Sequence, residues 1–185
     1  PLYRHDHADG NVAALFANVG REVDGDVVLS GHTDVVPVDV QAGDTDPFDV
    51  VARDGKYFGR GTCDMKGFDA LAIWTLVEAH YAGKSCQLAL SFDEEIGCLG
   101  APPMIAAMDG VVPKGGPVIV GEPSMMKAVT GHKGGQGFET HVVGFEVHSS
   151  LLPKGVSAIL EGAKIIDFAN HRNAENAAAE PSALA

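Results

Sequence analysis

The sequence predicts an α/β fold built on a mostly parallel sheet. Three short apolar runs without alternation, at residues 27–29, 88–92 and 118–120, are typical of strands that are buried on both faces. A helical pattern at residues 66–81 lies between the first and second runs, and another at residues 99–108 lies between the second and third. Strand, helix, strand, helix, strand in this order indicates parallel strands with helices packed on the sheet.

Turn signals place the remaining elements of the first part of the chain. Residues 12–18 form a short apolar run that ends before Gly20. Residues 35–50 hold two prolines with several Asp and Gly, so we expect a loop there. Asp54-Gly55 lies between two short apolar pairs, which predicts a hairpin.

A cluster of glycines at residues 131–137 marks an expected change of domain. We expect residues 1–130 to form part of an α/β catalytic domain. Residues 131–172 would begin an α+β lid or dimerisation domain, with a half-solvated strand at 138–147 and a helix from 156 to about 170. Residues 173–185 form an Ala-rich tail that is not expected to be ordered. We expect the chain to be a fragment that is cut at both ends.

The composition argues against several classes of protein. A net charge of -12 argues against a nucleic-acid-binding surface, because phosphates would repel it. No run approaches the roughly 18 apolar residues of a membrane span. Three cysteines are too few and too scattered for a disulfide framework, and reduced thiols indicate a cytoplasmic protein.

Polar residues follow the first predicted strand and precede the first long helix. His32 and Asp34 lie on the same side of an extended segment, so the carboxylate can hold the imidazole in a metal-binding tautomer. A histidine in the core is the simpler interpretation of His32 taken alone. Asp64 lies between a glycine-rich turn and the helix, where capping the helix is the common alternative to metal binding.

Further carboxylates follow the other two strands. Glu94 and Glu95 would repel each other unless a positive group lies near. In a regular strand they point to opposite faces, so they can serve one site only if the strand ends or kinks between them. Glu122 follows the third strand, and a solvated loop is the alternative for all three. Because ligands bind at the carboxyl ends of strands in such sheets, we expect these residues to converge with His32.

One imidazole and three or four carboxylates fit a pair of divalent metal ions, with zinc as the first choice. Such ions lie about 3.5–4 Å apart and share a bridging carboxylate and a water whose pKa falls towards about 7. One glutamate has to stay unligated, to take the proton of that water and pass it to a leaving amine. The spacing leaves open whether Glu94 or Glu95 is that base.

Five ordered motifs resemble those of the aminoacylase, acetylornithine deacetylase and succinyl-diaminopimelate desuccinylase family of zinc hydrolases. The resemblance covers nearly all of residues 10–172. Its motifs lie at residues 30–37, 59–67, 93–95, 121–123 and 148–150.

The resemblance implies a role for each candidate metal ligand. His32 and Glu122 would bind one zinc ion and Glu95 the other, with Asp64 bridging the two. The peptide between Asp64 and Met65 would be cis.

The resemblance also implies roles for three residues that do not bind metal. Glu94 would be the general base, and Asp34 would orient His32. His148 would lie on the lid of a homodimer and reach the substrate in the partner's site, where it would help to polarise the scissile carbonyl.

The resemblance implies a hydrolase that acts on a small N-acyl amino acid, with N-acetylornithine as the first expected substrate and zinc or cobalt as the metal. A succinyl-diaminopimelate desuccinylase, an aminoacylase or peptidase, and an inactive truncated metal-binding fragment are the alternatives. His132 and Lys133 could contact a substrate carboxylate, although an exposed hinge lysine is the simpler interpretation. The family's last zinc ligand, a histidine after the lid, has no expected counterpart among the other histidines.

Overall fold

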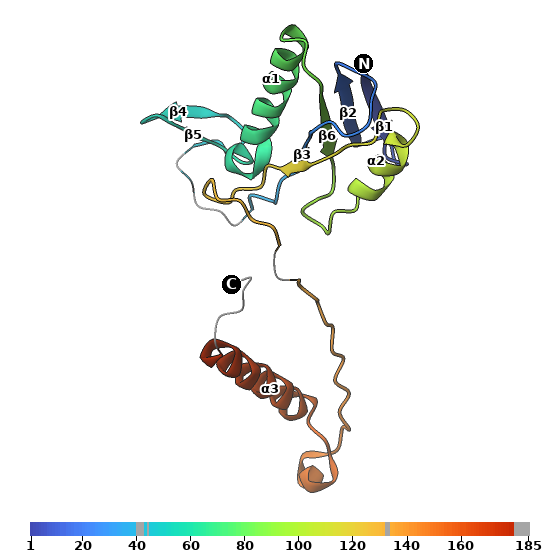
Figure 1. The fold of residues 1–185 in the computed structure, drawn as a ribbon. Coiled ribbons are helices and arrows are strands. Elements are labelled where there is room, and N and C mark those ends of the chain that lie inside the picture. Colours follow the sequence, from blue (N-terminus) through green and yellow to red (C-terminus); the bar gives the residue numbers. More distant parts are fainter. Residues whose placement is uncertain (40–42, 44, 132–133, 180–185) are drawn as a thin grey trace. The chain divides into compact units, whose positions relative to one another are not determined.

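The computed structural model describes residues 1–39, 43, 45–131 and 134–179. Contacts between Cα atoms divide the chain into two compact units, Pro1–Met126 and Lys127–Ala185 (Figure 1), and each is described by itself. The sequence predicts a change of domain near residue 130, which is close to this division. None of the helices in the described ranges is long and apolar enough to cross a membrane.

The first unit is built on a five-stranded sheet with the strand order β1-β2-β6-β3-β7 (Figure 1). β3 pairs in parallel with both β6 and β7, whereas β2 pairs antiparallel with β1 and β6. Four of the five strands therefore run in one direction, which confirms the predicted α/β class with a mostly parallel sheet. The strands are β1 (Leu2–Asp6), β2 (Ala13–Val19), β3 (Val28–His32), β6 (Cys86–Ser91) and β7 (Val118–Val120).

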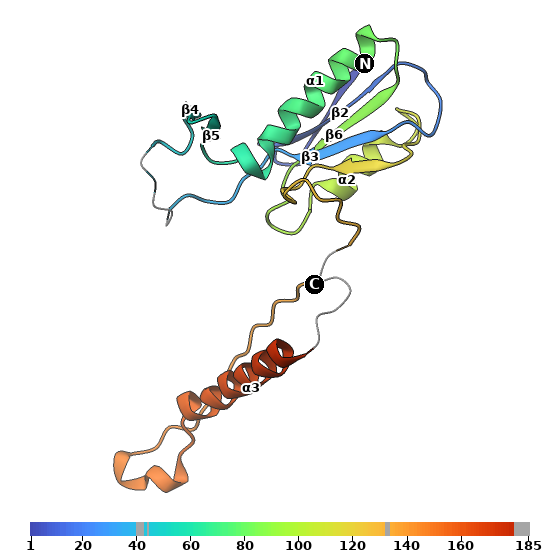
Figure 2. The same ribbon diagram turned by 60° about the vertical axis from the view of Figure 1, so that its left-hand side comes forward.

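Two helices cover the two faces of this sheet (Figure 2), namely α1 (Gly67–Tyr81) and α2 (Ala101–Met108). Alternate side chains of each strand enter one of two apolar clusters. On β2, Phe16 packs in the cluster that contains Met104 of α2, and Ala17 packs in the cluster that contains Ala72 of α1. Both helices are confirmed at the positions that the apolar periodicity predicts.

A hairpin and a short helical turn connect β3 to α1. The hairpin pairs β4 (Val51–Arg53) with β5 (Lys56–Phe58), and Asp54 and Gly55 form its turn, as the sequence predicts. After the hairpin the chain enters a π-helical turn, η1 (Thr62–Lys66), which continues into α1.

The second unit contains a short 3-10 helix, η2 (Ser149–Lys154), and a long helix, α3 (Ala158–Ala178). The predicted strand at 138–147 is wrong: the described residues form one isolated bridge there, between Phe145 and Val156. α3 confirms the predicted helix but runs beyond residue 170, so residues 173–178 of the expected tail are helical. Residues 180–185 lie outside the described residues.

Candidate metal centre

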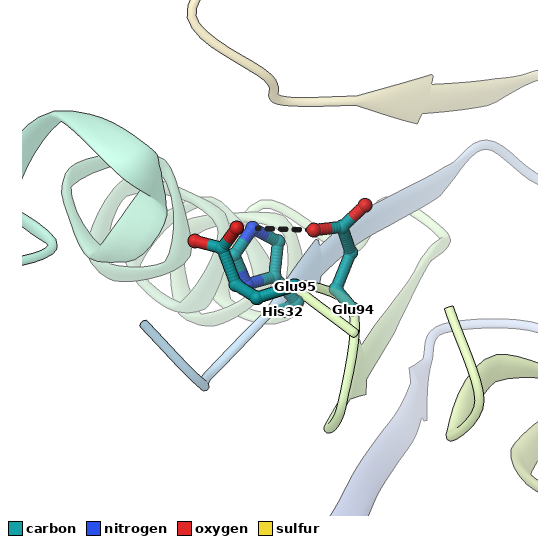
Figure 3. Close-up of side chains that lie close together, drawn as sticks. All are labelled: His32, Glu94 and Glu95. Carbon is teal, nitrogen blue, oxygen red and sulfur yellow. Dashed lines mark ion pairs between the residues drawn. The ribbon is translucent and has the colours of Figure 1, made fainter. Parts of the chain in front are cut away.

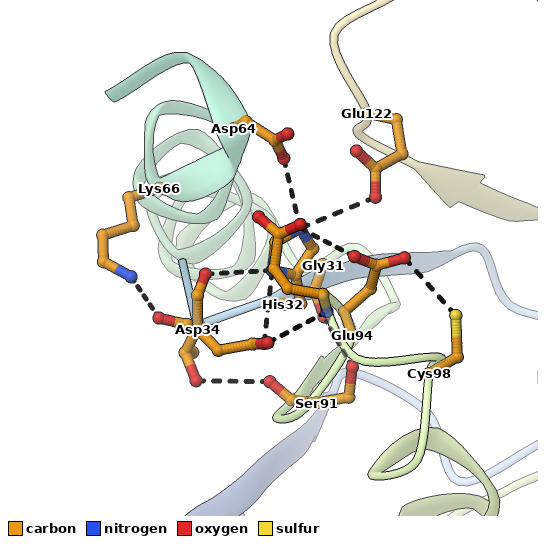
Figure 4. A network of polar contacts seen from close by, with 11 residues as sticks. Gly31, His32, Asp34, Asp64, Lys66, Ser91, Glu94, Cys98 and Glu122 are labelled. Carbon is orange, nitrogen blue, oxygen red and sulfur yellow. Dashed lines mark hydrogen bonds and ion pairs between the residues drawn. The ribbon is translucent and has the colours of Figure 1, made fainter. Parts of the chain in front are cut away.

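His32 ends β3 and lies at the carboxyl edge of the sheet. Its ring is buried, with 1% of the residue's surface exposed. The next residue keeps the chain against β6, because the backbone N–H of Thr33 donates to the carbonyl oxygen of Ser91 at 3.0 Å. The sheet therefore fixes the position from which the imidazole points into the site (Figure 4).

Asp34 holds one edge of the imidazole. Nδ1 of His32 lies 3.3 Å from Oδ1 of Asp34 and donates to the backbone oxygen of Asp34 at 3.1 Å. Both partners are acceptors, so the proton of the neutral ring belongs on Nδ1 and the lone pair of Nε2 faces the site. The other carboxylate oxygen, Oδ2, accepts a hydrogen bond from the backbone N–H of Glu95 at 3.1 Å.

Three carboxylates surround the other edge of the imidazole. Nε2 of His32 lies 3.2 Å from Oδ1 of Asp64, 3.7 Å from Oε1 of Glu122 and 3.8 Å from Oε2 of Glu94 (Figure 4). Two overlapping groups have ligand atoms within 4.8 Å of one another, and either could hold a metal ion. They are His32, Glu94 and Glu95, and His32, Asp64 and Glu122.

The end of β6 explains how two adjacent glutamates reach one site. The strand stops at Ser91, and Asp93 adopts a left-handed conformation with a φ of 52°. The chain then turns, and the N–H groups of residues 97 and 98 both donate to the carbonyl oxygen of Glu94 at 2.9 Å. The strand thus ends before the glutamates, so Glu94 and Glu95 both lie beside His32 (Figure 3).

The turn η1 carries Asp64 and excludes a capping role for it. The peptide between Asp64 and Met65 is cis, as the resemblance implies. The N-cap of α1 is Lys66, and its side chain makes no capping hydrogen bond. Lys66 instead reaches back to the residue after β3, where Nζ donates to the carbonyl oxygen of Thr33.

Glu122 is positioned by the close approach of α1 to the end of β7. The N–H of Gly121 donates to the carbonyl oxygen of Ser30 at 3.2 Å. A methyl group at Gly121 would overlap the ring of Phe68, which belongs to the first turn of α1. Only glycine therefore lets the helix lie this close to the residue before Glu122.

The site holds more negative than positive charge. Burial lowers the pKa of His32, but Asp34 and Glu122, with help from Asp64 and Glu94, raise it above its ordinary value of 6.5. Burial raises the pKa of Glu122, and the neighbouring Asp64 adds to this effect while His32 opposes it. A divalent cation would relieve the repulsion among these carboxylates, and the donor set of one imidazole with carboxylate oxygens suits such an ion.

Two residues near the site were not predicted from the sequence. The thiol of Cys98 donates to Oε1 of Glu94 at 3.4 Å, and this hydrogen bond raises the pKa of the thiol. Asp69 is buried in the first turn of α1, and burial raises the pKa of its carboxyl to about 6. Its spacing of three residues from the buried Ala72 is the signal that could have placed Asp69 on the inward face of the helix.

The remaining predicted contacts lie elsewhere. His148 belongs to the second unit, where it is exposed and caps η2, its Nδ1 accepting from the backbone N–H of Ser150 at 3.2 Å. Among the described residues, His148 belongs to neither of the two candidate metal-binding groups. His132 and Lys133 lie outside the described residues.

Residues 28–183 match Peptidase family M20/M25/M40. The chain is 37% identical over 147 residues to acetylornithine deacetylase of Pasteurella multocida (strain Pm70), and 38% identical to that of Edwardsiella ictaluri (strain 93-146). Each match covers 78% of this chain and 37% of the relative, so the chain spans well under half the length of these relatives.

Two solved structures share the fold at low sequence identity. The M20 family metallo-carboxypeptidase Sso-CP2 from Sulfolobus solfataricus superposes with a TM-score of 0.53 at 19% identity, over 63% of this chain and 27% of that one. Human carnosine dipeptidase 1 superposes with a TM-score of 0.52 at 21% identity, over 65% of this chain and 28% of that one. Because the family match extends over most of its length, this chain belongs to Peptidase family M20/M25/M40.

Proposed function

We propose that this chain supplies catalytic residues for metal-dependent hydrolysis of the amide bond in an N-acyl amino acid. The observation that supports this most is the imidazole of His32, buried at the edge of the sheet with three carboxylates around Nε2. Two divalent ions would be bound there. Zinc is the preferred candidate for both ions, and cobalt is the alternative. Bound there, the ions would polarise the scissile carbonyl and acidify the attacking water.

The proposed division of ligands is the one that the resemblance to the zinc hydrolases implies. His32 and Glu122 would hold one ion and Glu95 the other, with Asp64 between the two. Asp64 occurs in the same candidate group as Glu122, at 3.2 Å from Nε2 of His32, which is the closest approach of the three carboxylates. Asp34 would act on the far side of the ring by keeping the proton on Nδ1.

Glu94 is the proposed general base. Its Oε1 is engaged by the thiol of Cys98, while Oε2 faces the edge of His32 where the other carboxylates gather. Glu94 would take a proton from water as the water oxygen attacks the carbonyl carbon, and would pass that proton to the nitrogen as the C–N bond breaks. The products are a carboxylate and a free amine.

N-acetylornithine is the proposed substrate, which would give ornithine and acetate as a step of arginine biosynthesis. The support is similarity to several acetylornithine deacetylases at 34–38% identity. A succinyl-diaminopimelate desuccinylase or an aminoacylase would use the same chemistry on another acyl amino acid. A cytoplasmic homodimer is proposed for the whole protein, in which the second unit forms the lid and His148 reaches the partner's site.

The second candidate function is metal binding without turnover. The observation that favours it is that the chain spans 37% of the length of its relatives. Metal content and hydrolysis of acyl amino acids, measured on the chain loaded with zinc or cobalt, separate the two functions. Bound metal without hydrolysis of any acyl amino acid would leave only this second function, and absence of bound metal would refute both.

Two variants test the proposed roles. Glu94→Gln should abolish turnover and leave the metal content nearly intact, because the amide cannot take a proton. Asp64→Ala should lose metal, because it removes the shared ligand. Glu78→Gln, an exposed change on α1, is the control that should alter neither property. Equal loss of metal from the first two variants would contradict the division into base and bridge.

A further inference from the structure

Asp69 carries a buried carboxylate to which the proposed mechanism gives no role. It lies in the first turn of α1, and 6% of its surface is exposed. Neither carboxylate oxygen has a hydrogen-bond partner among the described residues. The positive end of the helix dipole stabilises a carboxylate here by about 0.3–1 kcal/mol, but an unpaired buried charge costs several kcal/mol. The local fold therefore gains nothing evident from this charge.

The carboxylate packs against the backbone that carries the metal centre. A methyl group at Gly31 would overlap Oδ1 of Asp69. The same methyl group would lie 3.1 Å from Cε of Met65. Gly31 is the residue before His32, and Met65, which is fully buried, is the residue after Asp64. Asp69 is thus placed directly beside the two segments that hold a proposed ligand and the proposed bridge.

The carboxylate of Asp69 interacts electrostatically with two cationic groups near the metal centre. Burial raises the pKa of the carboxyl to about 6, and the positive charges of His32 and Lys66 oppose that rise. The carboxylate is therefore mostly ionised at neutral pH, and it is buried, with 6% of the residue's surface exposed. Salt screens such buried interactions much less than it screens interactions between exposed charges.

We propose that Asp69 is a positioning residue that raises the affinity of the site for divalent cations, through a buried negative charge held against Gly31 of β3. This inference rests on the metal centre of the proposed function. Asp69 touches no metal ion in this scheme and acts by electrostatic attraction at a distance. A carboxylate with a purely structural role would instead stabilise the metal-free fold.

The test compares Asp69→Asn with Glu78→Gln, which removes the same charge from the exposed face of the same helix. Zinc affinity is measured by competition with a chelator, the absorption spectrum of the cobalt form reports the ligand geometry, and thermal melting without metal reports the fold. We expect zinc binding by Asp69→Asn to weaken at least about tenfold, equivalent to 1.4 kcal/mol. Its cobalt spectrum should keep its band positions, and its metal-free melting temperature should stay equal or rise.

Each other outcome refutes the inference in a recognisable way. Equal zinc affinity in Asp69→Asn and the unmodified chain would remove Asp69 from the centre and leave the proposed function standing. A lower metal-free melting temperature, or failure of the variant to fold, would assign the carboxylate a structural role. Failure of the unmodified chain to bind zinc would overturn the metal centre itself, and the inference with it.

Discussion

The pH dependence of metal-free stability should reveal the buried carboxylate of Asp69. Its pKa is about 6 in the folded chain, against an ordinary value of 3.8. The folded state therefore binds this proton more tightly than the unfolded state does. The contribution of this carboxyl to the free energy of unfolding is fully present below its pKa in the unfolded chain. That contribution is lost as the pH rises through its pKa in the folded chain.

The magnitude follows from the two pKa values. At about 1.36 kcal/mol per pKa unit, the ionised carboxylate costs the folded state about 3 kcal/mol at neutral pH, and about 2 kcal/mol of this develops between pH ~4.5 and pH ~7.5. Asp69→Asn cannot titrate, so it lacks this decline. The free energy of unfolding of the variant, relative to the unmodified chain, should rise by that amount over the same range.

Urea titrations of metal-free protein at several pH values measure this difference. The single tryptophan, Trp74, lies on α1 and provides a fluorescence signal close to the change. Comparing differences across pH cancels the constant cost of burying an amide in place of a carboxylate. Glu78→Gln should show no such trend. Parallel pH profiles for Asp69→Asn and the unmodified chain would mean that the carboxylate is solvated, which would refute the reasoning.

Other predictions follow from the same contacts. Gly31→Ala should destabilise the fold by about 1–3 kcal/mol, and adding Asp69→Ser should recover much of the loss; strictly additive effects in a double-mutant cycle would show that the two residues do not touch. Gly121→Ala should cost a similar amount, because its methyl group would overlap the ring of Phe68; an unchanged urea midpoint would contradict this. Zinc affinity should fall as the pH drops below the raised pKa of His32, because the imidazolium cannot bind metal; affinity that stays flat from about pH 7 to about pH 5 would remove His32 from the ligands.

The sequence predicts the strands of the sheet well because short apolar runs bounded by turn signals are typical of strands. The three residues of β7, Val118–Val120, were predicted without error from their composition. Their environment was not, since all three are exposed. An apolar run indicates that a strand forms, but the sequence does not say which neighbours cover it. The same limit explains residues 138–147, where alternation suits a strand but the described chain supplies one bridge.

The positions of the candidate site residues follow from the sequence to the extent that they depend on strand ends. His32 and Asp34 contact each other as alternation along the chain requires. The spacing indicates that Glu94 and Glu95 can share a site only if the strand ends or kinks. It does not indicate whether the strand does so, because that depends on the left-handed turn at Asp93. Asp69 was overlooked because a carboxylate near the start of a helix is usually solvated, and its burial depends on a neighbouring Gly31 that lies far away in sequence.

Asp34 joins two parts of the site that are about sixty residues apart along the chain. One of its carboxylate oxygens lies against His32, and the other accepts from the backbone of Glu95. The two contacts of Asp34 therefore tie a proposed ligand of β3 to the loop after β6 that carries another proposed ligand. A preorganised site loses little conformational entropy when it binds. Changing Asp34 should thus slow metal uptake as well as weaken it, because the incoming ion would have to assemble its own ligands.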